Sequence, residues 1–260
     1  MKQRFAFLLA LAAALAACER AAPTNEADSA ALATITTADL LRHTQALAAD
    51  SMEGRAPGTI GEERAVRYLI SQFQALGLQP GNPNGTFTQD VPLVGMTAEP
   101  TAWFSAGGKR ISLSFPNEYV AMTRRVTPQV DVQNSDIVFV GYGVVAPEYG
   151  WDDYKGVDVK GKTIVMLIND PAITMPNDTT VLDTTKFRGR AMTYYGRWTY
   201  KYEIAAQKGA AAALIIHETG PAGYPYEVVK GSWSAEQFDV ISPDAAKRVP
   251  VEGWITLEKA

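Results

Sequence analysis

Two short apolar runs separated by an amphipathic segment constrain the fold more than any other feature of this sequence. Residues 164–168 read Ile-Val-Met-Leu-Ile, and residues 210–216 read Ala-Ala-Ala-Ala-Leu-Ile-Ile. Apolar runs of this length are typical of buried strands in a parallel sheet. Residues 194–208 between them have helical spacing and end at Gly209, a common C-terminal helix stop. The sequence therefore predicts two parallel strands joined by a right-handed helical crossover, and a fold of the α/β class with mixed α+β character.

Two glycine-rich segments match nucleotide-binding motifs, but each stands in the wrong structural context. Residues 141–146, Gly-Tyr-Gly-Val-Val-Ala, fit the dinucleotide pattern, yet Pro147 follows where a helix is required. Residues 156–163 fit the P-loop pattern, yet Gly161-Lys162-Thr163 leads into a strand instead of following one. We therefore expect a loop and a turn at these positions, and no nucleotide binding.

Residues 1–18 predict a lipoprotein signal peptide. A basic start precedes the apolar run 5–17, which is shorter than the roughly 20 residues that a membrane-spanning helix needs. The run ends in Leu-Ala-Ala-Cys and resembles a bacterial lipobox, so we expect lipidation at Cys18, the only cysteine of the chain. An ordinary secretory signal with an incidental cysteine is the alternative. Lipidation would anchor the chain to a cell-envelope membrane, facing the periplasm or the exterior, with residues 19–35 as a flexible tether.

Two helices are predicted between residues 36 and 80. Thr36 and Thr59 begin the capping patterns Thr-x-x-Asp and Thr-x-x-Glu, and apolar residues follow at helical spacing up to Gly77. We expect both apolar faces to pack in the core. Short strands are predicted between residues 86 and 140, with a hairpin turn at Gly107-Gly108 and a half-buried strand at 111–115. A further strand is predicted within residues 249–257.

Composition and charge exclude some classes of function. The chain is 47% hydrophobic and 20% charged, as in ordinary globular proteins. Its net charge of −4 is the wrong sign for a nucleic-acid-binding surface, so we expect no nucleic-acid partner. No G-x-S-x-G elbow is present, and Cys18 lies in the targeting segment, so serine and cysteine hydrolases gain no support.

Three blocks of sequence together resemble one family. The block 46–81 (ALAADSMEGRAPGTIGEERAVRYLISQFQALGLQPG) resembles the opening of bacterial zinc-dependent aminopeptidases with a two-metal site. The blocks 138–170 and 188–219 resemble the protease-associated domain that is inserted in those enzymes. The resemblance implies that residues 36–100 begin the peptidase domain. It also implies that residues 101–260 form the inserted domain, incomplete at its C-terminal end, so that the chain matches the N-terminal part of the family only.

The resemblance also shows which family residues this chain lacks. In the family, the zinc ligands follow the inserted domain, begin with a His-x-Asp motif and include an adjacent pair of glutamates. Here neither His43 nor His217 begins such a motif. The pair Glu62-Glu63 falls in the first turn of a helix, where carboxylates complement the helix dipole. No catalytic residue or metal ligand can therefore be assigned to this chain, and two zinc ions are expected only in a longer parent protein.

Four further candidates have ordinary structural explanations that we favour. His43 is predicted to be a structural or surface residue of the first helix. His217 closes a parallel strand, where ligands often bind, but only Glu218 accompanies it. In the loop 50–61 we expect a buried brace between an arginine and a carboxylate, rather than a functional loop. The residues concerned are Asp50, Glu53 and Arg55. An aromatic cluster, which we expect to pack in the core rather than to form a binding platform, comprises Tyr194, Tyr195, Trp198, Tyr200 and Tyr202.

Two hypotheses about function follow. The first is the N-terminal portion of a cell-envelope metallopeptidase that acts on peptide substrates through a two-zinc site beyond residue 260. In that case the 260-residue chain alone is expected to be inactive. The apolar face of the second helix (Val66, Leu69, Ile70 and Phe73) is then expected to be uncovered in this chain, because the sheet on which it would pack lies mostly beyond Ala260. The alternative is a non-catalytic envelope lipoprotein whose protease-associated-like domain binds or scaffolds. Continuation of the reading frame into a His-x-Asp motif would distinguish the two.

Overall fold

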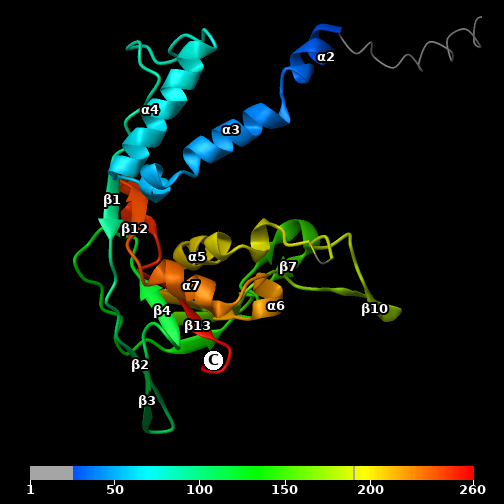
Figure 1. The fold of residues 1–260 in the computed structure, drawn as a ribbon. Coiled ribbons are helices and arrows are strands. Elements are labelled where there is room, and N and C mark those ends of the chain that lie inside the picture. The colour runs from blue at the N-terminus through cyan, green and yellow to red at the C-terminus, as the bar shows by residue number, and fades with distance from the viewer. Residues whose placement is uncertain (1–25, 190) are drawn as a thin grey trace, which may run out of the picture. The chain divides into compact units, whose positions relative to one another are not determined.

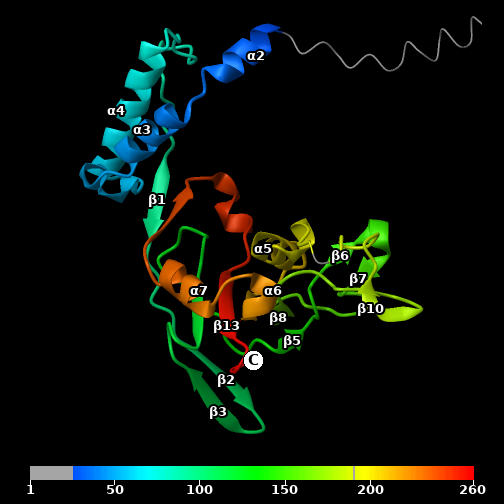
Figure 2. The same ribbon diagram turned by 45° about the vertical axis from the view of Figure 1, so that its right-hand side comes forward.

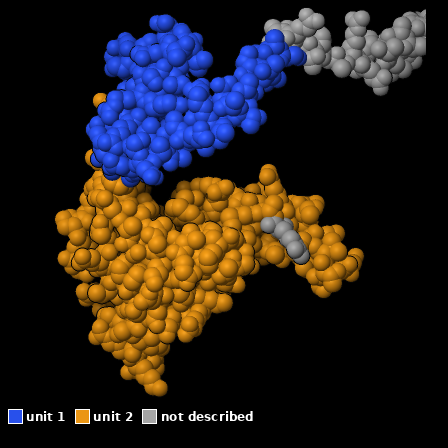
Figure 3. Space-filling model, viewed as in Figure 1, with its two compact units in different colours: residues 1–89 blue, residues 90–260 orange. Residues whose placement is uncertain are grey.

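The computed structural model describes residues 26–189 and 191–260, so Cys18 and the predicted signal peptide lie outside the described residues. The chain divides into two compact units, residues 1–89 and 90–260 (Figure 3). The sequence analysis instead places the boundary between the two domains at residue 100. The fold class is mixed α/β, with N-terminal helices followed by a five-stranded mixed sheet and its own helices, as the sequence predicts.

The first unit is helical in its described part. Its elements are α2 (Glu26–Ala33), α3 (Thr37–Leu47), the 3₁₀ segment η2 (Asp50–Arg55) and α4 (Ile60–Ala75). The two predicted caps are confirmed. The hydroxyl of Thr36 accepts from the Asp39 N–H at 3.1 Å, and that of Thr59 from the Glu62 N–H at 3.4 Å. Helix α2 lies inside the segment expected to be a flexible tether, because its four alanines favour a helix.

The helices do not pack in a core in this chain: the default expectation of core packing is wrong, and the uncovered apolar face expected of α4 in the 260-residue chain is observed. Helix α3 buries none of its residues, and α4 buries only Gly61 and Ala65. Leu40, Leu69 and Phe73 remain 58%, 42% and 41% exposed. The described part of this unit contains no sheet on which an amphipathic helix could bury its apolar face.

The second unit is built on a five-stranded sheet in the order β4-β13-β11-β8-β5. Its strands are β4 (Tyr119–Met122), β5 (Ile137–Phe139), β8 (Thr163–Leu167), β11 (Ala212–His217) and β13 (Val251–Thr256). β5, β8, β11 and β13 are parallel neighbours in chain order, and β4 pairs antiparallel with β13 at the edge. The predicted parallel pair 164–168 and 211–216 is confirmed, with Ile164 opposite Ala213 and Met166 opposite Ile215.

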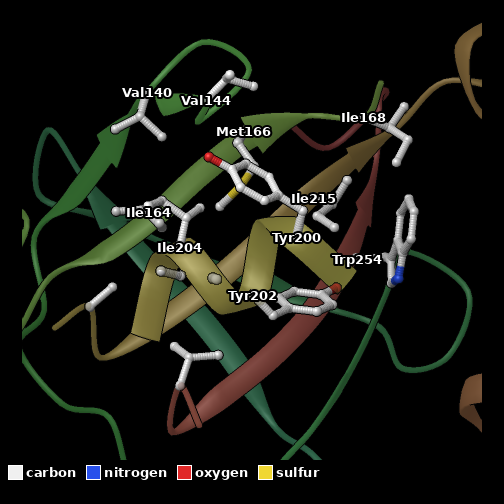
Figure 4. Close-up of a cluster of buried hydrophobic side chains, with 14 of the residues drawn as sticks. Val140, Val144, Ile164, Met166, Ile168, Tyr200, Tyr202, Ile204, Ile215 and Trp254 are labelled. Carbon is white, nitrogen blue, oxygen red and sulfur yellow. The ribbon is translucent and has the colours of Figure 1, made fainter. Parts of the chain in front are cut away.

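Helices cover one face of this sheet (Figures 1 and 2). They are α5 (Trp198–Gln207), which is the predicted crossover helix, α6 (Thr219–Ala222) and α7 (Tyr226–Trp233). Alternate strand residues point toward them, because side chains in a strand alternate between faces. Ile164, Met166, Ile215 and Trp254 belong to this larger core, with Tyr200 and Tyr202 facing them from α5 (Figure 4).

The opposite face carries a smaller apolar cluster. Leu214, Ile216 and Ile255 are buried there against Phe104 and Leu113. The latter two come from the hairpin β2 (Ala102–Ala106) and β3 (Lys109–Leu113), whose turn is the predicted Gly107-Gly108. The predicted half-buried strand at 111–115 is wrong in part. Ile111 is 49% exposed, because β2 and β3 form a separate two-stranded sheet that projects from the main sheet (Figure 1).

Short elements complete the second unit. Three antiparallel pairs are β1 (Leu93–Met96) with β12 (Gln237–Val240), β6 (Val145–Ala146) with β7 (Trp151–Asp152), and β9 (Thr174–Met175) with β10 (Asp178–Leu182). Three 3₁₀ segments are η3 (Pro147–Tyr149), η4 (Tyr194–Gly196) and η5 (Pro243–Lys247). β12 and η5 lead directly into β13 and bring charged side chains beside it.

Candidate functional site

His43 has a structural contact, as the sequence predicts. Its Nδ1 lies 2.7 Å from the hydroxyl oxygen of Tyr68, which joins α3 to α4. The two rings meet edge to face, with centroids 6.0 Å apart. Arg42 approaches the other ring nitrogen, Nε2, at 3.2 Å. Both nitrogens therefore have neighbours within the first unit, and the residue fastens the two helices together.

The loop 50–61 contains a brace, but with a different arginine from the one expected. Arg64 of α4 bonds the Glu53 carboxylate and the Ser51 carbonyl, each at 2.6 Å. The pair is not buried, since the two side chains are 38% and 53% exposed. The expected pairing through Arg55 is wrong. Arg64 can reach Glu53 because α4 lies beside η2. This close approach requires glycine at position 61, since an added Cβ would lie 2.2 Å from the Met52 carbonyl oxygen.

His217 is a core residue. It is 4% exposed, and its Nε2 lies 3.1 Å from the Tyr224 carbonyl oxygen. The rings of Tyr224, Tyr226 and Trp254 surround it at centroid distances of 5.5–6.0 Å. Burial lowers the pKa of His217 and favours the neutral ring. Its position at the end of β11 therefore serves aromatic packing.

Both nucleotide-motif segments have the local structure that the sequence predicts, a loop and a turn before a strand. After β5, residues 141–146 form a loop that continues into the short strand β6 and the 3₁₀ segment η3. The Gly161 N–H donates to the Gly209 carbonyl at 2.8 Å, and β8 begins at Thr163. Neither glycine-rich segment opens a helix, so its N–H groups do not converge on a helix N-terminus.

The aromatic cluster packs mainly in the core, as expected. Tyr200 and Tyr202 are buried, and Tyr202 donates to the Gly253 carbonyl at 2.8 Å. Tyr195 and Trp198 are half-buried, and Tyr194 is 54% exposed. The hydroxyl of Tyr195 bonds Glu148 at 2.7 Å. These contacts join α5 to β13 and η4 to η3, and they leave no continuous aromatic platform among the described residues.

The carboxyl ends of β5 and β8 meet around Lys201, a residue that sequence reasoning missed. Its side chain is fully buried, and its Nζ donates to the carbonyls of Tyr142 at 2.5 Å and Asn169 at 2.8 Å. Burial lowers the pKa of Lys201 to about 7, although nearby Asp170 and Asp153 oppose the shift. An amine with this pKa can act as a base or nucleophile, but this one has no solvent access and ties two loops together.

Asp170 completes that polar centre. The carboxylate is 5% exposed and accepts from both the N–H of Thr193, at 2.8 Å, and its hydroxyl, at 2.5 Å. Asn169 beside it has a left-handed backbone and donates to the Pro221 carbonyl at 3.0 Å. The centre therefore consists of satisfied polar groups that close the end of the sheet.

A second polar cluster lies beside β13, and sequence reasoning missed it too. Arg124 bonds Glu252 at 3.2 Å and Asp239 at 3.5 Å, and Arg248 also bonds Asp239. Burial raises the pKa of Glu252 to about 7 against the opposing charge of Arg124. Burial alone would raise the pKa of Asp239, but its contacts with Arg248 lower it. The signal in the sequence was Glu252, a carboxylate inside an apolar strand.

A cavity of about 240 Å³ adjoins this cluster. Arg124 and Trp254 line it from the sheet side, and Trp198 and Trp233 line it from α5 and α7. The Nε1 atom of Trp254 is buried and has no hydrogen-bond partner among the described residues. Aromatic side chains and a guanidinium line this cavity.

The described residues do not fit a metal centre. Within 26–189 and 191–260, no three His, Cys, Asp or Glu side chains gather closely enough to hold a metal ion. In the same ranges, no helix combines the length and the apolar character that crossing a membrane requires.

Comparisons with known proteins give one structural likeness. No protein-family model matches the chain, and no curated protein matches it. An aminopeptidase from Aneurinibacillus sp. strain AM-1 is similar over 84% of this chain, at 18% sequence identity and a TM-score of 0.32. This chain spans 39% of the length of that structure.

Proposed function

We propose that this chain is the N-terminal part of a cell-envelope metallopeptidase that removes N-terminal residues from peptides. The hydrolytic site, with its two zinc ions, would be formed by residues that follow position 260. Lipidation at Cys18 would hold the protein at a membrane of the envelope. The sequence blocks 46–81, 138–170 and 188–219 support this assignment through their resemblance to bacterial two-zinc aminopeptidases.

The observation that carries the proposal is the uncovered apolar face of α4. Leu69 and Phe73 lie four residues apart on one side of this helix, and Leu76 follows with 75% exposure. A helix with such a face normally packs on another layer of structure. The occupant that we infer is the sheet of the peptidase domain, because block 46–81, which contains α4, resembles the start of that domain.

The decisive experiment extends the chain. We would determine the coding sequence after Ala260, produce the longer protein, and measure hydrolysis of leucine p-nitroanilide with zinc and after chelation. We expect metal-dependent hydrolysis by the longer protein only, and stronger amide-exchange protection of residues 60–75 than in the 260-residue chain. A longer protein without hydrolysis, or with α4 equally unprotected, would contradict the proposal.

The structure of the second unit favours one alternative. Its sheet has helices on one face and a hairpin on the other, and it holds the cavity beside Trp254. These features suit a non-catalytic envelope lipoprotein that binds or scaffolds. A stop codon directly after Ala260 would favour this function over the peptidase.

A further inference from the structure

We propose that the outer edge of β5 pairs with β5 of a second copy of this chain, so that two five-stranded sheets join into one. β5 (Ile137–Phe139) is the last strand of its sheet, and β8 is its one strand neighbour among the described residues. Three observations carry the inference: free backbone groups on this edge, uncovered apolar side chains beside them, and a strand that complements itself.

The backbone of β5 has a bonded side and a free side. The Asp136 carbonyl and the Val140 N–H both bond the backbone of β8, at 2.9 and 3.0 Å. Backbone groups of successive residues in a strand point to opposite sides, so the N–H and C=O groups of Ile137 and Phe139 point away from β8. These groups have no hydrogen-bond partner among the described residues.

The chain on both sides of β5 turns back toward β8. Before β5, the hydroxyl of Ser135 donates to the Gly161 carbonyl at 3.2 Å, just ahead of β8. After β5, the Gly141 carbonyl accepts from the Leu167 N–H at 2.8 Å. Neither flanking segment therefore supplies the missing strand.

The side chains of the same two residues are apolar and uncovered. Ile137 is 49% exposed and Phe139 is 60% exposed. Val140 belongs to the core beneath the helices (Figure 4), so these two side chains lie on the opposite face of the sheet, beside Val165 of β8. The edge thus combines free hydrogen-bonding groups with apolar surface.

β5 contains none of the residues that keep edge strands from pairing with other chains. Charged side chains and prolines commonly have this role. The strand reads Ile-Val-Phe and includes neither. At the other edge of the sheet, β4 is buried at all four of its residues. The sheet is therefore open to strand addition at β5.

A second copy of β5 is a strand that matches this edge. In an antiparallel pairing centred on Val138, Ile137 of each copy lies opposite Phe139 of the other. Opposite residues whose N–H and C=O groups face each other exchange both hydrogen bonds, so these pairs use every free backbone group of the edge. The side chains of each pair meet on one face of the sheet. The same patch serves both copies, as a closed twofold dimer requires.

Charge does not oppose this arrangement. Asp136 of one copy would lie opposite Val140 of the other, which leaves the two Asp136 residues roughly 14 Å apart along the strands. That separation exceeds the Debye length of about 8–10 Å at physiological ionic strength. Another extended peptide would need its own apolar residues two positions apart, and β5 already has them at the required positions.

The interface is small, so the dimer should be weak. β5 has 3 residues, and interfaces that bury less than about 1,200 Å² belong to weak or transient complexes. We expect a dissociation constant on the order of 0.1–1 mM. The pairing groups all belong to residues 90–260, so the inference does not depend on the peptidase proposal, and association and hydrolysis can fail separately.

Sedimentation of the full chain carrying Cys18→Ala measures the association. We expect the mean mass to rise from monomer toward dimer between about 10 μM and about 1 mM. Phe139→Lys adds a charge to the edge at an exposed position, so it should keep both the fold and the monomer mass. Leu69→Lys is the matched control, because it places the same charge on the exposed apolar face of α4, and it should associate as the parent does.

Cysteine cross-linking tests the register. Opposite residues of a hydrogen-bonded pair have Cα atoms about 5.5 Å apart, which a disulfide can span. Chains with Ile137→Cys and chains with Phe139→Cys, both also carrying Cys18→Ala, are mixed under oxidising conditions and analysed by mass spectrometry. We expect the mixed disulfide to exceed either same-variant disulfide by about tenfold, because identical positions face each other only diagonally.

Three outcomes would overturn the proposal. The first is a parent chain that keeps its monomer mass at about 1 mM. The second is association that persists in Phe139→Lys, and its loss in Leu69→Lys would then place the contact on α4. The third is a statistical mixture of the three disulfides, which would exclude the antiparallel register. If Phe139→Lys fails to fold, the cross-linking result decides the question.

Discussion

The guanidinium of Arg124 lies 3.2 Å from the carboxylate of Glu252, although 128 positions separate the two residues. Both side chains are largely buried, at 16% and 5% exposure. This pair connects the segment after β4 to the inner strand β13, and Arg124 also lines the cavity beside Trp254. We therefore expect removal of this contact to lower the free energy of unfolding of the second unit.

Arg124→Met should strongly destabilise the second unit. Above pH 7, where Glu252 is ionised in the parent, the substitution leaves its buried carboxylate without its main partner, and breaking a buried ion pair typically costs about 3–5 kcal/mol; the loss should be smaller at lower pH, where Glu252 takes up a proton. Urea unfolding followed by far-UV circular dichroism would measure the change. The control is Arg67→Met, which removes an exposed pair with Glu63 and should change stability by less than about 0.5 kcal/mol. Equal effects of the two substitutions would refute the role given to Arg124.

The stability of the chain should depend on pH through two buried groups with opposite signs. The pKa of Glu252 is raised from 4.5 to about 7, so its contribution is present below pH 4.5 and is lost as pH rises toward 7. The pKa of Lys201 is lowered from 10.5 to about 7, so its contribution is present above pH 10.5 and is lost as pH falls toward 7. Together these two groups favour a minimum in the free energy of unfolding near neutral pH.

Two variants separate these contributions. Glu252→Gln should remove the acid limb of the pH dependence, and Lys201→Met should remove the alkaline limb, each with a slope of at most about 1.4 kcal/mol per pH unit. The measurement is the difference in unfolding free energy between parent and variant across the pH range. A constant difference would show that the residue has the same pKa in the folded and unfolded chains.

Gly253→Ala should destabilise the sheet by overpacking. A Cβ at this position would lie 2.6 Å from the Val120 carbonyl oxygen and 2.8 Å from Leu214 Cδ2, within an inner strand. Overpacking of this kind typically costs about 1–3 kcal/mol. Gly231→Ala in α7 is the matched control, since nothing lies within 4 Å of its added Cβ. Because alanine favours helix, the control should gain up to about 1 kcal/mol. Thermal unfolding of both variants tests the contrast.

Leu69→Ser should have different effects in the 260-residue chain and in a longer parent protein. In the chain alone the side chain is 42% exposed, so the free energy of unfolding should change by less than about 0.5 kcal/mol. In a longer protein that buries the face of α4, the loss should approach about 1.5–3 kcal/mol. Similar small losses in both proteins would mean that nothing covers this helix.

Cys18→Ala should release the protein from membranes. The basic start, the apolar run and the sequence Leu-Ala-Ala-Cys motivate the prediction. Membrane fractionation and metabolic labelling with an alkyne fatty acid would compare the variant with the parent. Unchanged fractionation with retained labelling would exclude lipidation at this residue.

The sequence predicted the elements whose signals are local. Thr36 and Thr59 predicted the starts of their helices, because capping depends on residues only three positions apart. The strands at 164–168 and 211–216 followed from short apolar runs, and the order of Gly161 and β8 excluded a P-loop. In each case the information lies within one element and its immediate neighbours.

The features that sequence reasoning missed depend on distant partners. Lys201 is satisfied by backbone carbonyls 32 and 59 positions away, and backbone carbonyls have no sequence signature. The bond between Arg124 and Glu252, and the cavity that adjoins it, require the order of the strands to be known. The expected brace through Arg55 failed for the same reason, since Arg64 reaches Glu53 only once α4 lies beside η2.

The order of the strands also has a consequence for synthesis on the ribosome. β8, β11 and β13 can each join the strand of this sheet made before it, beginning with β8 on β5, but β4, made before all of them, pairs only with β13. About 130 residues separate these partners, a delay of roughly 6–26 s at 5–20 residues per second. During that interval the apolar run Tyr119–Met122 has no strand partner. The nascent chain therefore contains an unpaired, aggregation-prone strand until most of β13 has been synthesised.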